Sequence, residues 1–287
     1  MERLTLVRQG ELNSFVKKKK EIPIKFCYVG VAWHKIATDP NYTLATREKS
    51  ILEKSVKLIY PKIKNPINIL HLGAGNGVEI PYVVDAIGLE KIGIYAIVDI
   101  NKSMLNLAKS FALKKYSKLN IKSYFKDIEG EGIKDIAEEL KRKGANRNLI
   151  LLIANGVLFS NSKIVRFIRQ SIKNEDRFFF TLELFKREKQ KEIFDSYMIP
   201  AVLNLLSIGV KRAGFQPNYD KFSIKYDSKT QRMKQFFQIN GEKFLVLSSY
   251  KPTNIEKIEK RLKKYGLKKE FLIENKKIHS CSGLFKI

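Results

Sequence analysis

The sequence HLGAGNG, residues 71–77, places three glycines at alternate positions directly after the apolar run INIL. Glycine adopts backbone angles that other residues avoid, and it lets a ligand approach the main chain where a Cβ would intrude. A loop that follows a strand and leads into a helix is where open α/β sheets bind ligands. We therefore expect Gly73 to allow a tight turn, Gly75 to admit a ligand and Gly77 to let the next helix pack closely. A tight turn without a ligand is the alternative.

The spacing of this loop differs from two common nucleotide-binding loops. The dinucleotide fingerprint G-x-G-x-x-G requires a glycine at position 78, where this chain has Val78. A P-loop requires Gly-Lys followed by Ser or Thr, and the loop contains no such sequence. The glycines alone therefore do not identify the ligand.

Polar residues follow the next three apolar runs, each where a strand is expected to end. Asp99 ends IYAIVD, Asp127 follows IKSYF, and Asn155 follows LILLIA. A carboxylate at position 99 can accept the hydrogens of both ribose hydroxyls, and an acid or backbone group near 127 can bind the exocyclic amine of adenine. Alternatively, Asp99 caps the helix that starts near Lys102, and Asp127 is an ordinary loop residue.

Taken in order, these elements resemble the S-adenosylmethionine site of a class I methyltransferase. The resemblance implies that S-adenosylmethionine is the cofactor. It assigns cofactor contacts to a set of loop residues: Gly73, Ala74, Gly75, Asn76, Asp99, Ile100, Asp127, Ile128 and Asn155. His71 departs from the pattern, because many such enzymes carry an acid at this position.

The elements that must position these residues alternate along the chain. Strands are expected at 67–72, 94–98, 121–125, 149–154 and 177–184, and helices between them at 79–88, 102–115, 133–143 and 162–173. This alternation predicts an α/β fold, a Rossmann-like parallel sheet with helices on both faces. LILLIA is almost entirely apolar, which is typical of a strand buried on both faces.

The remaining segments predict a second, discontinuous α+β domain. Residues 1–60 and 187–213 look mostly helical, whereas 222–227, 232–239 and 243–250 look like strands, the last two joined as a hairpin by Asn240-Gly241-Glu242. A helix is expected at 254–265 and a strand pair within 267–287. We therefore predict a cofactor domain from 61–186 plus 253–287 and a substrate-recognition domain from 1–60 plus 187–252.

Motifs outside the predicted sheet narrow the comparison. YVGVAWHKIATDPNYTLATREKSIL (28–52), HLGAGNG, VDIN, YDSKTQR (226–232) and SSYK (248–251) resemble the histidine-specific Nα-methyltransferase family of the ergothioneine pathway. The resemblance covers nearly the whole chain. It implies an enzyme with an S-adenosylmethionine donor and an amine acceptor that resembles an amino acid.

The same resemblance implies roles for matched residues. Tyr28, Tyr42 and Ser249 correspond to substrate-contacting residues, Arg47 lies in Thr-Arg-x-Glu with a role at the cofactor, and Asn155 lies where the family holds the substrate amine and carboxylate. Tyr42 and Asn155 are the candidate catalytic residues, since the enzyme mainly has to align the amine with the methyl group.

Three acceptor-site positions depart from the family. Leu247 replaces a carboxylate that grips imidazole, Phe194 replaces a tyrosine, and Gln235 stands near the position of a methionine. Leucine cannot make the charge-assisted hydrogen bond that recognises imidazole. We therefore expect N-methylation of a small amine or amino-acid-like acceptor with a side chain less polar than histidine, not of histidine itself.

Composition leaves an alternative open. The chain has 55 Lys and Arg residues against 29 acids, a formal net charge of +26, which favours polyanions such as RNA. A methyltransferase with an RNA or protein acceptor is thus the alternative, although the segment after the fourth strand, Ala-Asn-Gly-Val, lacks the Pro-Pro-aromatic motif of base methylases. It also lacks the acid that an aminopropyl transferase needs. A lysine-rich surface without a specific partner explains the charge equally well.

Other sequence features predict a cytoplasmic protein without a metal. No apolar run approaches the ~18 residues of a membrane span, and the N-terminus lacks the features of a secretory signal. Cys27 and Cys281 are not in a metal-binding or redox spacing, and the chain has only 3 histidines. The sequence does not indicate the oligomeric state or the number of methyl groups transferred.

Overall fold

A computed structural model describes residues 16, 18–28, 30–62, 66–128 and 132–287 of the chain. The helical structure predicted before residue 16 therefore lies outside the described residues. Among the described residues, no single helix is long and apolar enough to cross a membrane.

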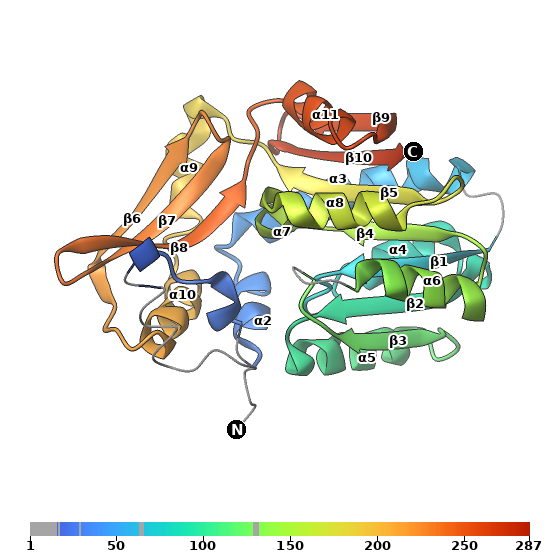
Figure 1. Cartoon of the computed structure of the whole chain (residues 1–287), viewed down its shortest axis with the longest axis horizontal. Coiled ribbons are helices and arrows are strands. Elements are labelled where there is room, and N and C mark those ends of the chain that lie inside the picture. The colour runs from blue at the N-terminus through green and yellow to red at the C-terminus, as the bar shows by residue number, and fades with distance from the viewer. Residues whose placement is uncertain (1–15, 17, 29, 63–65, 129–131) are drawn as a thin grey trace.

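The apolar runs form a seven-stranded sheet in the order β3-β2-β1-β4-β5-β10-β9 (Figure 1). Its first five strands run parallel, β10 pairs antiparallel with β5, and β9 pairs antiparallel with β10. The strands are β1 (Ile67–Leu72), β2 (Ile92–Asp99), β3 (Ile121–Phe125), β4 (Asn148–Leu152), β5 (Arg177–Glu183), β9 (Lys268–Asn275) and β10 (Ser280–Lys286). The strand order reverses direction between β1 and β4, and ligands of open sheets bind beyond the carboxyl ends at such a point.

Helices cover both faces of this sheet, as the sequence predicts. They are α3 (Thr43–Ile59), α4 (Ile80–Ile87), α5 (Lys102–Lys115), α6 (Ile133–Lys143), α8 (Ser162–Ser171) and α11 (Ile255–Lys263). Apolar residues of α6, α8 and α11 share one buried cluster, and those of α3, α4 and α5 share another. In β5, Phe178 and Phe180 belong to the first cluster and Phe179 to the second, because successive strand side chains face opposite ways. The fold is thus a Rossmann-like α/β fold.

A smaller antiparallel sheet lies beside the seven-stranded sheet (Figure 1). It contains β6 (Asn218–Asp227), β7 (Arg232–Ile239) and β8 (Glu242–Tyr250), and it packs with α2 (Ala32–Ala37), α9 (Gln190–Asp195) and α10 (Pro200–Arg212) around a third apolar cluster. The predicted hairpin is confirmed: β7 pairs with β8 across Asn240 and Gly241, both of which have positive φ. Such turns match the twist of the flanking strands.

Two elements differ from the sequence-based description. Helix α3 lies within the predicted substrate domain, yet Leu52, Val56 and Ile59 pack in the core of the seven-stranded sheet. A short helix, α7 (Gly156–Ser160), begins where the glycine loop and β8 converge and was not predicted. Five residues are too few to show a helical repeat in sequence, so its formation depends on its capping residue and its packing.

Candidate active site

The glycine loop connects β1 to α4, and all three of its glycines have positive φ. Each also lies close to another group. A Cβ on Gly73 would lie 2.7 Å from Asn155 Nδ2, one on Gly75 would lie 3.3 Å from the indole of Trp33, and one on Gly77 would lie 2.8 Å from Ala108 Cβ. The sequence-based roles of a tight turn and a close helix contact fit this geometry. Contact with Trp33, from α2, was not foreseen.

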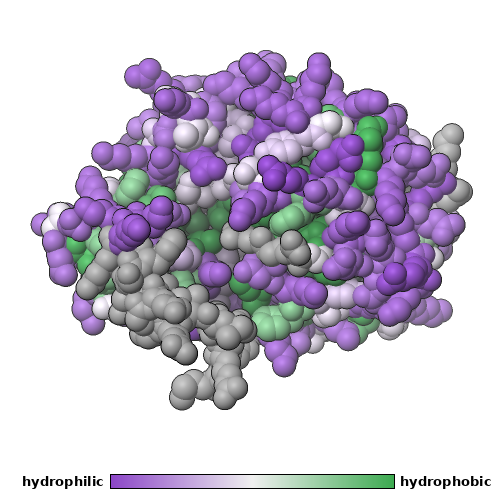
Figure 2. All heavy atoms as spheres, viewed as in Figure 1, coloured by the Kyte–Doolittle hydropathy of each residue, from purple (hydrophilic) through white to green (hydrophobic). Residues whose placement is uncertain are grey.

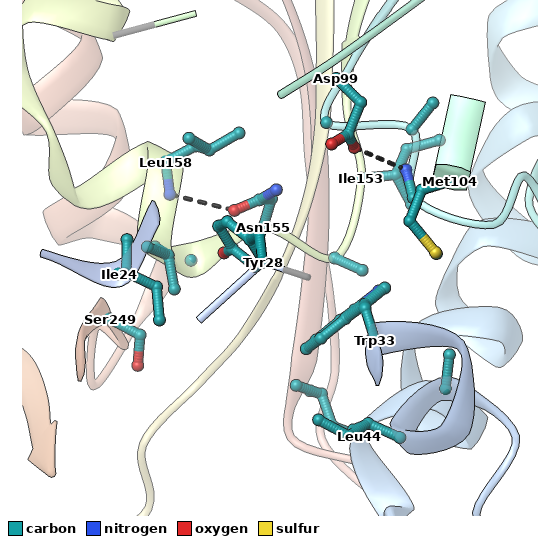
Figure 3. Close-up of a pocket in the computed structure, with 18 of the residues that line it drawn as sticks. Ile24, Tyr28, Trp33, Leu44, Asp99, Met104, Ile153, Asn155, Leu158 and Ser249 are labelled. Carbon is teal, nitrogen blue, oxygen red and sulfur yellow. Dashed lines mark hydrogen bonds between the residues drawn. The ribbon is translucent and has the colours of Figure 1, made fainter. Parts of the chain in front are cut away.

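Asp99 ends β2 directly opposite this loop (Figure 3). Its Oδ2 accepts the Gly75 N–H at 3.1 Å, and its Oδ1 accepts the Asn101 N–H at 2.9 Å. Burial raises the pKa of Asp99, and these backbone donors partly oppose the rise. Asn101, not Asp99, caps α5, because its side chain accepts the Met104 N–H. The capping alternative for Asp99 is therefore wrong.

Asn155 follows β4 and faces the loop from the other side. Its Oδ1 accepts the Leu158 N–H at 3.0 Å and so caps α7 (Figure 3). This bond sets the orientation of the amide and leaves Nδ2 beside Gly73. The preceding Ala154 has φ of 56°. A non-glycine residue in this conformation is strained, and such strain is concentrated at functional sites.

One cavity of about 400 Å³ connects these groups with residues of the smaller sheet. Its wall includes most of the sequence-predicted cofactor residues: Gly73, Ala74, Gly75, Asp99, Ile100, Asp127, Ile128 and Asn155. The predicted acceptor residues Tyr28, Tyr42, Leu247 and Ser249 line the same cavity. Residues far apart in sequence thus meet at the switch point of the sheet.

Two of these residues have informative surroundings. The side chain of Asp127 is 40% exposed, with Lys25 Nζ at 3.8 Å, so this end of the cavity reaches solvent. Tyr42 is buried, and its ring meets Trp33 and Tyr197 edge to face at centroid distances of 6.1 and 5.7 Å. These contacts hold the Tyr42 ring in place in the cavity wall.

Four predicted site residues do not line this cavity. The Arg47 guanidinium pairs with Glu183 at 3.1 Å and with Glu192, so its charge is directed at carboxylates of the protein. Asn76 binds His34 of α2 at 3.0 Å. Phe194 packs against another aromatic ring in the third cluster, and Gln235 is fully buried beside its cross-strand partner Leu247. Sequence alignment places residues on elements but cannot tell which side chains reach the cavity.

The sequence analysis missed a buried ionic cluster at the end of the cavity that the predicted acceptor residues line. Lys251 Nζ donates to Glu183 Oε2 and, at 2.7 Å, to the Tyr197 hydroxyl; this hydroxyl also lies 3.2 Å from Glu183 Oε2. All three residues line the cavity. An isolated acid within the apolar run RFFFTLEL was the available signal for Glu183, because a charge on a buried strand needs partners. The predicted acceptor side chain took no account of these ions, because it was inferred from Leu247, Phe194 and Gln235.

A second unforeseen group lies next to the glycine loop. Lys49 of α3 and Glu79 and Tyr82 near the start of α4 all line the cavity. Lys49 Nζ lies 5.6 Å from the centroid of the Tyr82 ring. Burial raises the pKa of Glu79 to about 7. Groups of both charges are thus present beside the loop.

His71, which departs from the resembled pattern in the glycine segment, does not line the cavity. Its Nδ1 is 3.2 Å from the Tyr95 hydroxyl, and the ring is buried. Burial lowers the pKa of His71 to about 3, so the imidazole is neutral.

The fold and this site define a class I methyltransferase that uses S-adenosylmethionine. A family model described as histidine-specific, S-adenosylmethionine-dependent methyltransferase matches residues 7–261. The chain belongs to this family, and S-adenosylmethionine is its cofactor. The residues fit that group, because the bare loop and the Asp99 carboxylate form a cradle that a Cβ on Gly75 would narrow.

Solved structures show the same fold at low sequence identity. The CcbJ methyltransferase from Streptomyces caelestis superimposes with a TM-score of 0.51 at 10% identity, covering 93% of this chain and 98% of that one. An O-methyltransferase family 2 protein from Planctomyces limnophilus, in complex with apigenin, gives a TM-score of 0.50 at 13% identity, covering 89% and 64%. A search of curated proteins found no match.

Proposed function

We propose that this enzyme methylates the nitrogen of a small amine or amino-acid-like acceptor other than histidine. The main support is one cavity of about 400 Å³ that Asp99, Tyr42, Asn155 and Ser249 all line. Its volume falls in the range of sites for small molecules, roughly 300–1,000 Å³. An acceptor held between these walls would lie next to the cofactor-binding loop.

Each residue then has a defined task. Bound S-adenosylmethionine supplies an electrophilic methyl group. Asn155 offers its Nδ2–H beside Gly73, because its Oδ1 is used to cap α7. Tyr42, held between two aromatic rings, orients the acceptor nitrogen through its hydroxyl. Such alignment supplies most of the acceleration when the reacting groups need little covalent help. The proton of the amine passes to solvent or to a nearby base.

Leu247 supports the exclusion of histidine. It lines the cavity at the position where the resembled family has its imidazole-binding carboxylate. A site that lacks the partner of a polar group discriminates against that group strongly. Leu247→Glu should therefore increase turnover of histidine, whereas Leu247→Met, which keeps the apolar character, should not.

A panel of amines and amino acids, scored by release of S-adenosylhomocysteine, tests the proposal. We expect turnover of at least one small amine, lowered by Tyr42→Phe. Histidine as the best substrate would contradict the acceptor assignment. If every small amine fails, the acceptor is macromolecular. Hydrophilic residues cover most of the face in Figure 2, and the +26 charge then makes RNA the first candidate to test, with binding that weakens steeply as salt rises.

A further inference from the structure

The end of β8 brings a buried ammonium group to the cavity wall. Leu247, Ser249 and Lys251 occupy alternate positions and all line the cavity, as expected for residues on one side of an extended segment. Lys251 is only 3% exposed, and its ammonium points at Glu183 and Tyr197. The cavity wall therefore carries a buried ammonium group next to the Glu183 carboxylate.

The buried part of this cluster contains more positive than negative charge. Arg47 is 7%, Lys251 3% and Glu183 2% exposed, and both cations pair with this one carboxylate. Glu192, the other partner of Arg47, is 47% exposed at its side chain but contacts the guanidinium directly, so the whole cluster holds two cations and two acids. The Lys251 ammonium has three N–H donors, of which Glu183 and Tyr197 take two. An anion in the cavity would accept the third.

A second donor lies beside Lys251 on the same wall. Ser249 is 5% exposed, and its Oγ has no hydrogen-bond partner among the described residues. Residues two apart on a strand are separated by roughly 7 Å, so a carboxylate between them can accept from the hydroxyl and the ammonium together. Leu247, the next residue along this wall, contributes no competing negative charge.

We infer that the acceptor carries an acidic group on its side chain, bound by Lys251 and Ser249. This inference rests on the proposed amine-methylating function, with the acceptor nitrogen beside Asn155. The acceptors expected are amino acids with a carboxylate side chain. Their carboxylate accepts from the Lys251 ammonium and the Ser249 hydroxyl, and their amine points to the glycine-loop wall.

Two isosteric pairs, glutamate with glutamine and aspartate with asparagine, test this inference. We expect kcat/KM for the acid of one pair to exceed that for its amide by roughly 10- to 100-fold, the value of one charge-assisted hydrogen bond. Lys251→Met should bring that ratio close to one, and Ser249→Ala should reduce it in part. Lys243→Met, a change at an exposed lysine of the same strand, should leave the ratio unchanged.

Folding is controlled separately, because Lys251→Met leaves Glu183 with one partner fewer. The double variant Lys251→Met/Glu183→Gln removes one charge of each sign, and its melting temperature and cofactor affinity show whether it folds. Turnover of amides equal to that of acids overturns the inference but leaves the proposed function intact. A preference for acids that survives both Lys251 variants overturns the assignment of Lys251. Failure of every amine overturns the proposed function itself.

Discussion

Replacing Asp99 by Asn tests the cofactor site at its most constrained point. Each carboxylate oxygen already accepts one backbone N–H, from Gly75 at 3.1 Å and from Asn101 at 2.9 Å. The remaining lone pairs are those that would accept the ribose hydroxyls. Asparagine removes the charge and turns one oxygen into a donor, which then opposes one of these N–H groups. Hydrogen bonds to a charged acceptor are worth about 1.5–3 kcal/mol each.

The expected loss is therefore about 2–4 kcal/mol, or a roughly 30- to 1,000-fold higher Kd for S-adenosylmethionine. Isothermal titration calorimetry measures this directly. Asp85→Asn is the matched control, because that carboxylate is 58% exposed and pairs with Lys115 on the outside of the sheet. Since burial raises the pKa of Asp99, affinity of the unaltered enzyme should also weaken on acidification. Unchanged affinity in Asp99→Asn would show that this carboxylate does not hold the ribose.

Further predictions concern the loop, its flanking acid, the acceptor tyrosine and the buried histidine. Gly77→Ala should lower the free energy of unfolding in urea by about 2–4 kcal/mol, because its Cβ meets Ala108 and its φ is positive; Gly241→Ala, also at positive φ but with nothing within 4 Å, should cost only about 1–2 kcal/mol. The pKa of Glu79 is raised from 4.5 to about 7, so the folded state binds this proton more tightly and the free energy of unfolding falls as pH rises between those values. In the same assay, Glu79→Gln should have a free energy of unfolding about 2–3 kcal/mol above that of the unaltered protein at pH values above 7, and no such advantage below pH 4.5. Tyr42→Phe should slow methyl transfer in single-turnover measurements while calorimetry shows unaltered cofactor affinity, and a loss of that affinity would move Tyr42 out of the acceptor site. Burial lowers the pKa of His71 from 6.5 to about 3, so the free energy of unfolding should fall by about 1.4 kcal/mol per pH unit as pH drops below 6.5 toward 3. A series of urea titrations should find this slope in the unaltered protein but not in His71→Gln.

Much of the fold was readable in the sequence because its signals are local. Periodicity or chemistry over a few neighbouring residues is enough to predict the buried strand RFFFTLEL, the glycine loop and the polar strand ends at Asp99 and Asn155. Parallel strands place their carboxyl ends at one edge, so residues that end successive strands must meet there. This rule predicted that Asp99, Asp127 and Asn155 lie near the glycine loop, and all three line one cavity with it.

Helix α3 and the short helix α7 show where local signals stop. Apolar spacing marks α3 as amphipathic but does not say which of two cores receives its apolar face. Helix α7 has no periodic pattern at all, and its start depends on the Asn155 cap and on close packing against Tyr250, whose carbonyl oxygen would lie 2.8 Å from a Cβ on Gly156.

The α/β alternation, the glycine loop and the order of polar residues at strand ends are encoded locally, because backbone and side-chain chemistry fix these features over short distances. Which distant charges share one site depends on how the chain folds in three dimensions. Arg47, Glu183 and Lys251 lie on three different elements, and nothing in their local sequence indicates that they converge. Burial makes that convergence necessary, since an ion removed from water requires a partner. The tertiary structure placed Ser249 and Lys251 on the cavity wall and directed Arg47 to Glu183 and Glu192.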